Sequence, residues 1–433
     1  MVPKTVKHVN MKIQWNFACL RQLYRVYLRC RCTVRRAVLL ILCLVGGGGY
    51  ILSKWNMVCS NWEITAVLDD LCADVEEGRA LGTLCKEICM KNTLVPQQCQ
   101  AFHGGKEVVF RALFHDLPVY VKGRRSISRD NDENLFWKDE EGNEHFPTLP
   151  EFKEIMKNHL YHNYNVSFTE KTFFKLWSQP LNRDNFSTDQ NNLLLKLSLE
   201  TLWNLSQDQE FVFLSLFEHT DIFPELYGYC GGLYIVEEVT PLDFPSLIER
   251  PTFNSWARRA KIALKILDFT EKLDAEFDSP VHLCDVKPEH FGLSDNSKVK
   301  FNDADNIYLK PVVDRTVGDG SHCTKHSDCD LFDCKGQCDL IRQKCSRRGV
   351  SNNNLQVICQ KIFLGKSYGF KSLGGTGLLA SRHGEKVLKP LLEACANPSA
   401  AKDEVRLRAD DSHLRSIKTA LEDIIQADQQ MAK

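Results

Sequence analysis

Apolar and polar residues alternate in two neighbouring stretches of this chain, residues 107–114 and 117–122. Both are rich in Val, Phe and Tyr, and the intervening residues 115–116, His-Asp, suit a tight turn, so the pattern predicts a β-hairpin. Residues 226–230 and 233–236 have the same strand-forming character on either side of a Gly-Gly pair. We therefore expect a β-rich part of the chain before residue 240.

Apolar residues recur with helical spacing in four longer stretches. Residues 149–160 form one, residues 191–205 carry seven leucines, and residues 256–277 and 410–432 are amphipathic. Strands and helices together in one chain are consistent with an α+β fold. The chain has 433 residues, 43% of them hydrophobic, which is enough for one large domain or two ordinary ones.

One apolar run differs from these helices because it is uninterrupted. Residues 37–52 read AVLLILCLVGGGGYIL, about 24 Å as a helix against a hydrocarbon core of about 30 Å. Residues 1–36 before it carry nine Lys or Arg and no acidic residue. Positive charge stays on the cytoplasmic side, so the pattern predicts a signal anchor at 37–53 and a type II membrane protein.

Two alternatives to this signal anchor stay open. A cleaved signal peptide would have an unusually long charged region and lacks an A-x-A-like cleavage site. A buried helix would leave nine adjoining positive charges uncompensated, whereas anionic cytoplasmic lipid would attract them. The same charges resemble a nucleic-acid-binding arm only by sign, so we expect no nucleic-acid partner.

The cysteines favour an oxidising compartment. Of 18 cysteines, 14 lie beyond the apolar run, a density that is uncommon in reducing cytosol. Five fall in or next to a stem at 54–100, where we expect disulfides; zinc stays an alternative, although no His has the spacing of a compact site. Three sequons predict N-glycosylation in a lumen: Asn165, Asn185 and Asn204.

The most specific motif lies at residues 282–291, HLCDVKPEHF, and is followed from residue 300 by KFNDADN. The order Asp285, Lys287 and then Asp303 matches two elements of protein kinases. These are the catalytic loop H-R-D-L-K-P-E-N, whose Asp accepts the acceptor hydroxyl proton, and the metal-binding D-F-G. We therefore expect catalytic roles for Asp285 and Lys287 and a metal-binding role for Asp303.

The same motif departs from the kinase pattern at several positions. Leu283 and Cys284 replace the His-Arg pair, and His290 replaces the metal-binding Asn. The segment that begins at Asp303 reads Asp-Ala-Asp in place of D-F-G. We expect Asp305 and His290 to supplement the metal site, and imidazole suits Mn²⁺ better than Mg²⁺. For His290, hydrogen bonding to Asp285 is the alternative role.

Upstream residues fit the nucleotide-binding half of such a site. The stretch V-x-V-K-G ending at Lys122 resembles V-A-I-K, whose Lys pairs with the α- and β-phosphates and with a helix Glu. Glu200, in the leucine-rich helix, is the expected partner, with a surface Glu as the alternative. Residues 237–240 resemble the hinge that contacts adenine. The G-x-G-x-x-G phosphate cover is missing.

A long insertion at about 126–190 interrupts this half. Counting from Asp130 places Asp132 at position three, Asn134 at five and Glu141 at twelve, the oxygen ligands of a calcium loop, but Leu135 stands where Gly is required. Ca²⁺ binding here is one interpretation, and an acidic solvated loop is the other.

Five cysteines occupy the place of an activation segment, and no A-P-E follows. We expect disulfides among them, which would lock a loop that phosphorylation normally orders. Cys284 is expected either to bond into this cluster or to be a reactive thiol. The five are Cys323, Cys329, Cys334, Cys338 and Cys345.

On these residues the chain resembles the divergent protein kinase domain 1 family, cysteine-rich type II membrane proteins of the endoplasmic reticulum. The resemblance implies a bilobal kinase-like fold with disulfide-rich insertions, and residence in the reticulum membrane with Arg35-Arg36 as a retention signal. The implied organisation is a cytosolic tail at 1–36, a span at 37–53, a stem at 54–100, an N-lobe at 101–240 and a C-lobe at 241–433.

Two functions follow as hypotheses. The first is a lumenal kinase that uses ATP with Mg²⁺ or Mn²⁺ to phosphorylate hydroxyls of secretory-pathway proteins or glycans. The second is a pseudokinase whose lobes serve as a binding or regulatory scaffold. Retention of Lys122, Asp285 and Asp303 favours the first, and loss of the Gly-rich loop and the metal-binding Asn favours the second. The sequence leaves substrate, disulfide pairing and oligomeric state open.

Overall fold

The computed structural model describes residues 61–103, 106–123, 135, 137–138, 141, 144–177, 189–242, 253–294, 297–365, 377–379, 386–398 and 407–431. Within this part, Ser60–Lys433 forms one compact unit. The basic tail, the apolar run at 37–53, the Arg35-Arg36 pair and the start of the stem lie outside the described residues. No helix in the described part has both the length and the apolar character that crossing a membrane requires.

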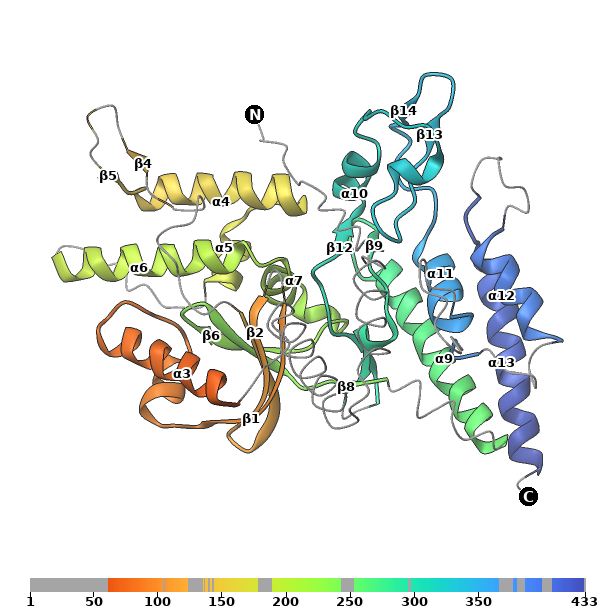
Figure 1. Cartoon of the computed structure of the whole chain (residues 1–433), viewed down its shortest axis with the longest axis horizontal. Coiled ribbons are helices and arrows are strands. Elements are labelled where there is room, and N and C mark those ends of the chain that lie inside the picture. Colours follow the sequence, from red (N-terminus) through yellow and green to blue (C-terminus); the bar gives the residue numbers. More distant parts are fainter. Residues whose placement is uncertain are drawn as a thin grey trace, which may run out of the picture. The chain divides into compact units, whose positions relative to one another are not determined.

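A five-stranded antiparallel sheet forms the N-terminal part of this unit, in the order β1-β2-β3-β7-β6 (Figure 1). The turn between β2 and β3 contains His115 and Asp116, both with positive φ, as expected for a type I′ hairpin turn. Both predicted strand pairs are confirmed. The strands are β1 (Leu94–His103), β2 (Lys106–Phe114), β3 (Leu117–Gly123), β6 (Leu226–Cys230) and β7 (Leu233–Glu237).

The two faces of this sheet bury different cores. Val119 and Val121 of β3 pack in one cluster with Ile64 of α3 (Asn61–Glu76). Tyr120, which points to the opposite face because side chains alternate along a strand, packs against the main core of the unit. Disulfides brace the α3 side: Cys72–Cys89 joins α3 to η1 (Lys86–Met90), and Cys85–Cys230 joins the stem to β6.

Helices cover the second face of the sheet. The helix α4 (Leu149–Tyr164) starts at a Thr148–Glu151 capping box and ends at Asn165, which has a left-handed conformation. The predicted helix at 149–160 is confirmed. The other elements here are β4 (Trp137–Lys138), β5 (Glu144–His145), α5 (Glu170–Leu176), α6 (Asp189–Ser206), α7 (Gln209–Phe217) and η3 (Glu218–Thr220).

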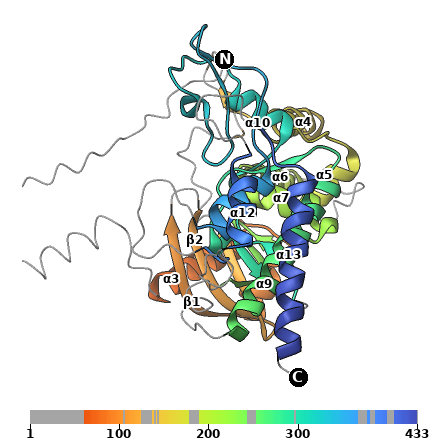
Figure 2. The ribbon, with the colours of Figure 1, turned by 90° about the vertical axis from the view of Figure 1, so that its right-hand side faces the viewer.

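The C-terminal part is mainly helical. The helix α9 (Phe253–Ala275) lies alongside α13 (Asp411–Met431), as Figures 1 and 2 both show, and both correspond to predicted helices. Two small sheets hold the candidate catalytic segments: β8 (Thr240–Pro241) pairs with β10 (Phe291–Leu293), which pairs with β11 (Val299–Phe301). The second sheet pairs β9 (Val281–Leu283) with β12 (Ile307–Leu309).

A disulfide-rich segment follows α10 (Lys310–Val317) and contains η5 (His326–Cys329), β13 (Cys338–Asp339) and β14 (Lys344–Cys345). We call residues 323–345 the cysteine knot, a name that refers here to the density of disulfides and not to a disulfide threaded through a ring. The chain then enters α11 (Asn354–Val357), which continues into η6 (Ile358–Phe363) and packs against α12 (Leu388–Ala396). Cys359–Cys395 ties η6 to α12.

Candidate functional site

Lys122 lies near the end of β3, opposite Tyr234 of β7. Its ammonium Nζ is 2.6 Å from Glu210 Oε1 and donates a second hydrogen bond to the backbone oxygen of Asn302 at 2.9 Å. The Lys122 side chain is 12% exposed and the Glu210 side chain 1%. A pair this buried must offset the desolvation of both charges. The contact with Asn302 brings Lys122 next to the acidic segment that begins at Asp303.

The prediction that Glu200 pairs with Lys122 is wrong. Glu200 lies on α6 and is half-buried, whereas the ion pair of Lys122 is made with Glu210 on α7. The leucine periodicity of α6 suggested a helix facing the site, but α7 is buried on all sides from Glu210 to Leu216. Such a helix has no polar face, so periodicity gave no signal for it.

The first turn of α7 joins the sheet to the acidic segment. Asp208 caps this helix through Oδ1, which accepts from the N–H groups of Glu210 and Phe211. Tyr234 donates its hydroxyl to the other oxygen of Asp208 at 3.0 Å, and Gln209 donates to the backbone oxygen of Ala304 at 2.8 Å. Burial, followed by the charge of Asp208, raises the pKa of Tyr234, so its hydroxyl stays a donor.

The candidate catalytic loop begins where β9 ends. Lys287 Nζ lies 2.8 Å from Asp285 Oδ2, and the Asp285 side chain is 21% exposed. Burial alone would lower the pKa of Lys287, but its hydrogen bond to Asp285 and the charges of Asp285 and Asp303 raise it. Lys287 therefore stays a cation beside the carboxylate that is the predicted base.

His290 sits between the two predicted acidic residues. Its Nδ1 is 2.9 Å from the backbone oxygen of Asp285, and its Nε2 is 3.3 Å from Asp303 Oδ2. A carbonyl oxygen only accepts, so Nδ1 carries the proton. Nε2 then faces the carboxylate, forming an ion pair when the ring is protonated and presenting a second acceptor when it is neutral. Two acceptors this close suit a shared divalent cation, and hydrogen bonding of the other ring nitrogen is typical of metal-ligating histidines.

Asp303 and His290 therefore fit a metal ion as a pair of ligands. Asp305 donates its backbone N–H to Asp303 Oδ1 at 3.2 Å. Burial, then the charge of Asp305, raises the pKa of Tyr308. Among the described residues, one group of three side chains lies close enough together to hold a metal ion: Cys323, Cys329 and Cys338. These three cysteines are disulfide-bonded.

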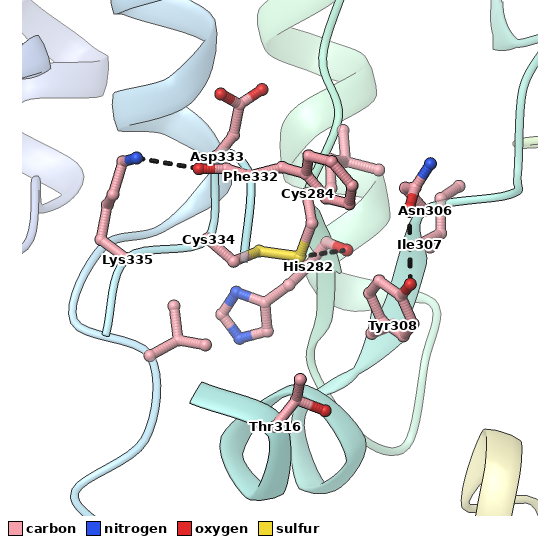
Figure 3. The surroundings of a disulfide bond; sticks show 12 residues. His282, Cys284, Asn306, Ile307, Tyr308, Thr316, Phe332, Asp333, Cys334 and Lys335 are labelled. Atoms are coloured by element: carbon pink, nitrogen blue, oxygen red, sulfur yellow. Dashed lines mark hydrogen bonds between the residues drawn. A yellow bond between two sulfur atoms is a disulfide. The ribbon is translucent and has the colours of Figure 1, made fainter. Parts of the chain in front are cut away.

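The loop around Asp285 is fastened to the cysteine knot, as Figure 3 shows. Cys284 forms a disulfide with Cys334, so the prediction that it bonds into the cluster is confirmed and the reactive-thiol alternative is wrong. Asp333 donates its N–H to the backbone oxygen of Cys284 at 2.7 Å, and its Oδ2 accepts from the N–H of Val286 at 2.8 Å. Nothing in the sequence pattern indicated Asp333.

Asn354 holds the strand that leads into this loop. Its side-chain oxygen accepts from the N–H of Leu283 at 2.9 Å, and its nitrogen donates to the backbone oxygen of Val281 at 2.7 Å. Asn354 is 4% exposed and begins α11. The loop is therefore supported on one side by α11 and on the other by the knot.

Three large side chains lie near Lys122, on the face of the sheet that carries it. Tyr120 is two residues before Lys122 on β3 and directly opposite Arg111 of β2. Arg111 Nε is 2.7 Å from Glu238 Oε1, and Glu238 follows the last residue of β7. Burial, then the charge of Glu238, raises the pKa of Tyr120. In V-A-I-K the residue two positions before the Lys is Ala, so this face of the sheet is bulkier here and carries the charges of Arg111 and Glu238.

The remaining predicted site residues are cysteines, calcium-ligand candidates and sequons, some of them outside the described part. The other knot disulfides are Cys323–Cys338 and Cys329–Cys345, and Cys99 is disulfide-bonded too, which confirms the predicted bracing. Of the calcium residues, Asp130, Asp132 and Asn134 are outside the described residues, and Glu141 is exposed. Of the sequons, Asn165 and Asn204 are half-buried and Asn185 is outside the described residues.

Two family models match the chain. The first is described as the N-terminal cysteine-rich ER region of FAM69 and matches residues 22–178, which include Lys122. The second is described as the protein-kinase domain of FAM69 and matches residues 202–398, which include Glu210, Asp285 and Asp303. The two matches together cover most of the chain.

Proposed function

Since this chain belongs to the FAM69 family of divergent kinase-like proteins, we propose that it is a metal-dependent phosphotransferase. It transfers the γ-phosphate of ATP to hydroxyl groups of secretory-pathway proteins or glycans. The proposal rests on one observation above the others, the buried ion pair between Lys122 and Glu210 at 2.6 Å. In protein kinases the corresponding pair must be in place for activity.

The roles follow from position. Lys122 orients the α- and β-phosphates, since its ammonium lies beside the acidic segment. Asp303 and His290 hold Mg²⁺ or Mn²⁺, and such an ion neutralises charge on the transferred phosphate. Asp285 accepts the proton of the acceptor hydroxyl, and Lys287 Nζ lies 2.8 Å from its carboxylate. The reaction needs no covalent enzyme intermediate, because positioning and charge supply most of the catalysis in phosphoryl transfer.

The proposal includes a location. The printed description of the N-terminal family model names the endoplasmic reticulum, and six disulfides with both partners among the described residues suit an oxidising lumen. We propose a single-pass type II arrangement with residues 37–53 in the membrane, the Arg35-Arg36 signal in the cytosol and a glycosylated lumenal domain. Glycosidase sensitivity of the 433-residue chain in sealed microsomes tests this, and the outcome against it is protease access to the folded unit from the cytosolic side.

The test of activity uses the full-length chain purified in detergent. We expect ATP with Mn²⁺ or Mg²⁺ to raise its Tm, and phosphate to be transferred from ATP to a pool of Ser- and Tyr-containing peptides or to free glycans. Asp303→Ala should abolish both effects, whereas Asp423→Ala, which removes an exposed carboxylate of α13, should leave them unchanged. No Tm change with either metal would contradict the proposal.

A second function, that of a scaffold without phosphoryl transfer, is favoured by a different observation. Tyr120 and the Arg111–Glu238 pair lie on the face of the sheet that carries Lys122, where the kinase motif V-A-I-K has a small residue. The same assay separates the two functions, because a scaffold that binds nucleotide gives a Tm change with ATP and metal but no product in either acceptor pool.

A further inference from the structure

One residue binds the backbone on both sides of Asp285. The peptide group before Asp285 contributes the Cys284 oxygen, which accepts from the N–H of Asp333 at 2.7 Å. The peptide group after Asp285 contributes the Val286 N–H, which donates to Asp333 Oδ2 at 2.8 Å. Peptide groups are planar and rigid. Fixing both of them therefore fixes the backbone of Asp285 and the direction in which its carboxylate leaves the chain.

Asp333 is itself held firmly. It is 5% exposed, and its second carboxylate oxygen, Oδ1, is 2.8 Å from Lys361 Nζ. Its backbone oxygen accepts from the side chain of Asn352 at 2.8 Å. A buried carboxylate is tolerated only when it is paired and hydrogen-bonded, and Asp333 meets both conditions through contacts to three separate segments.

The turn that presents Asp333 is closed at both ends. Leu331 and Cys334 exchange two backbone hydrogen bonds, each 2.9 Å long. Phe332 has a φ of 50°, a conformation that costs free energy for a bulky residue and is found where surrounding contacts impose it. Cys334 then carries the disulfide to Cys284. The turn is thus bonded to the catalytic loop by two hydrogen bonds and by one covalent link, the disulfide drawn in Figure 3.

We propose that Asp333 is a positioning residue for the phosphoryl-transfer reaction, which aims Asp285 at the acceptor hydroxyl by clamping its two peptide groups. This inference rests on the proposed function and deepens it. The clamp is present without any added phosphate, because its charge partner Lys361 and its disulfide are built into the chain. The cysteine knot therefore does permanently what a phosphorylated activation segment does conditionally in other kinases.

The test compares Asp333→Ala and Asp333→Asn with the wild-type full-length chain. ATP turnover is measured as phosphate release to water and to the peptide pool, per folded molecule. We expect Asp333→Ala to lower kcat roughly 10- to 100-fold, since small misplacements of a reacting group have effects of this size. KM for ATP should change less than about twofold, because Lys122 and Asp303 are untouched. Asp333→Asn keeps an acceptor for the Val286 N–H and should recover part of kcat.

Asp330→Ala is the matched control. Asp330 is a neighbouring carboxylate of the same knot, 12% exposed, which pairs with Lys335 at 3.0 Å and accepts from the N–H of Gly336. The Asp330→Ala variant should have a lower free energy of unfolding but an unchanged kcat. Equal kcat for Asp333→Ala and Asp330→Ala would overturn the inference.

A second readout does not depend on activity. Hydrogen exchange at the Val286 amide should be at least about tenfold faster in Asp333→Ala than in Asp330→Ala, because only the first removes its acceptor. If the wild-type chain transfers no phosphate, the proposed function fails. The exchange rates then decide whether Asp333 holds the loop. Unchanged exchange at Val286 would overturn the positioning role of Asp333 as well.

Discussion

Lys122 and Asp285 stand on opposite sides of the candidate site and are held by different kinds of bond. Lys122 is held by an ion pair with Glu210, 88 residues away, and by one backbone oxygen. The loop of Asp285 is held by a disulfide, by Asp333 and by Asn354. The sheet side therefore depends on a contact that can separate, and the loop side on a covalent one.

This difference shows where regulation can act. In ordinary kinases the corresponding ion pair forms or breaks with the position of its helix, and that position controls activity. A loop tied by Cys284–Cys334 keeps its geometry in all states of the oxidised protein. We therefore expect changes on the sheet side to alter nucleotide binding, and changes on the loop side to alter stability and turnover.

The largest expected effect comes from cutting the loop side. Cys284→Ser with Cys334→Ser removes a disulfide with a sequence separation of 50 residues, which the loop-entropy estimate values at about 4 kcal/mol. The urea midpoint should fall accordingly, and kcat should fall with it. Cys329→Ser with Cys345→Ser, at a separation of 16, should cost about 3 kcal/mol and leave kcat per folded molecule near wild type. Equal loss of kcat in both pairs would show that the link to Cys284 has no special role.

Breaking the sheet side should have the next largest effect. Glu210→Gln leaves the Lys122 ammonium without its charge partner at a site where both side chains are buried, and we expect a loss of about 3 kcal/mol in unfolding free energy. The metal-dependent Tm change with ATP should disappear. Glu200→Gln is the matched control, because it alters a half-buried glutamate of α6, and should cost less than about 1 kcal/mol. A larger loss from Glu200→Gln would restore that residue as the partner.

How far the sequence predicts this site depends on whether the signal is local. The β2–β3 hairpin and α4 were predicted to within a few residues, because strand alternation, turn residues and caps act over short distances. The order of Lys122, Asp285 and Asp303 identified the main polar groups of the candidate site for the same reason. Each belongs to a short motif with a characteristic spacing.

The contacts that hold those groups were not predicted, because they join segments far apart in sequence. Glu210 lies on a helix that is buried on all sides, so periodicity cannot orient it. Asp333 acts through backbone groups 47 residues away, and no spacing rule describes such a contact. The partner of Cys85 is Cys230, at a separation of 145, and pairing at this range is decided by the fold alone.

A pH titration probes the loop side through His282, whose ring lies beneath the Cys284–Cys334 disulfide (Figure 3). Burial, followed by the charge of Arg408, lowers the pKa of His282 from 6.5 to about 4. The unfolded chain therefore binds more protons between these values, so unfolding free energy should fall as the pH drops from 6.5 to 4 and level off below. The loss at pH 5 is about 2 kcal/mol.

His282→Leu provides the control for that titration. Nε2 of His282 has no hydrogen-bond partner among the described residues, so an apolar side chain of similar size leaves no donor or acceptor unpaired. The variant should keep the stability of the wild type at pH 7 and lose most of the decline between pH 6.5 and 4. An unchanged decline would assign the pH dependence to other groups.

The smallest expected effect concerns the face of the sheet that carries Lys122. Tyr120 packs on the side of Lys122, while Tyr227 of β6 packs against the opposite core, so the two aromatic residues form a matched pair. If Tyr120 crowds the position that adenine takes, Tyr120→Ala should tighten ATP binding about tenfold, or about 1.4 kcal/mol, in calorimetric titrations with Mn²⁺. Binding of inorganic tripolyphosphate should not change, because it has no base, and Tyr227→Ala should affect neither ligand. Tighter binding of both ligands to Tyr120→Ala would mean that Tyr120 affects binding of the phosphates. The difference between the sheet side and the loop side would then rest on Lys122 and Glu210 alone.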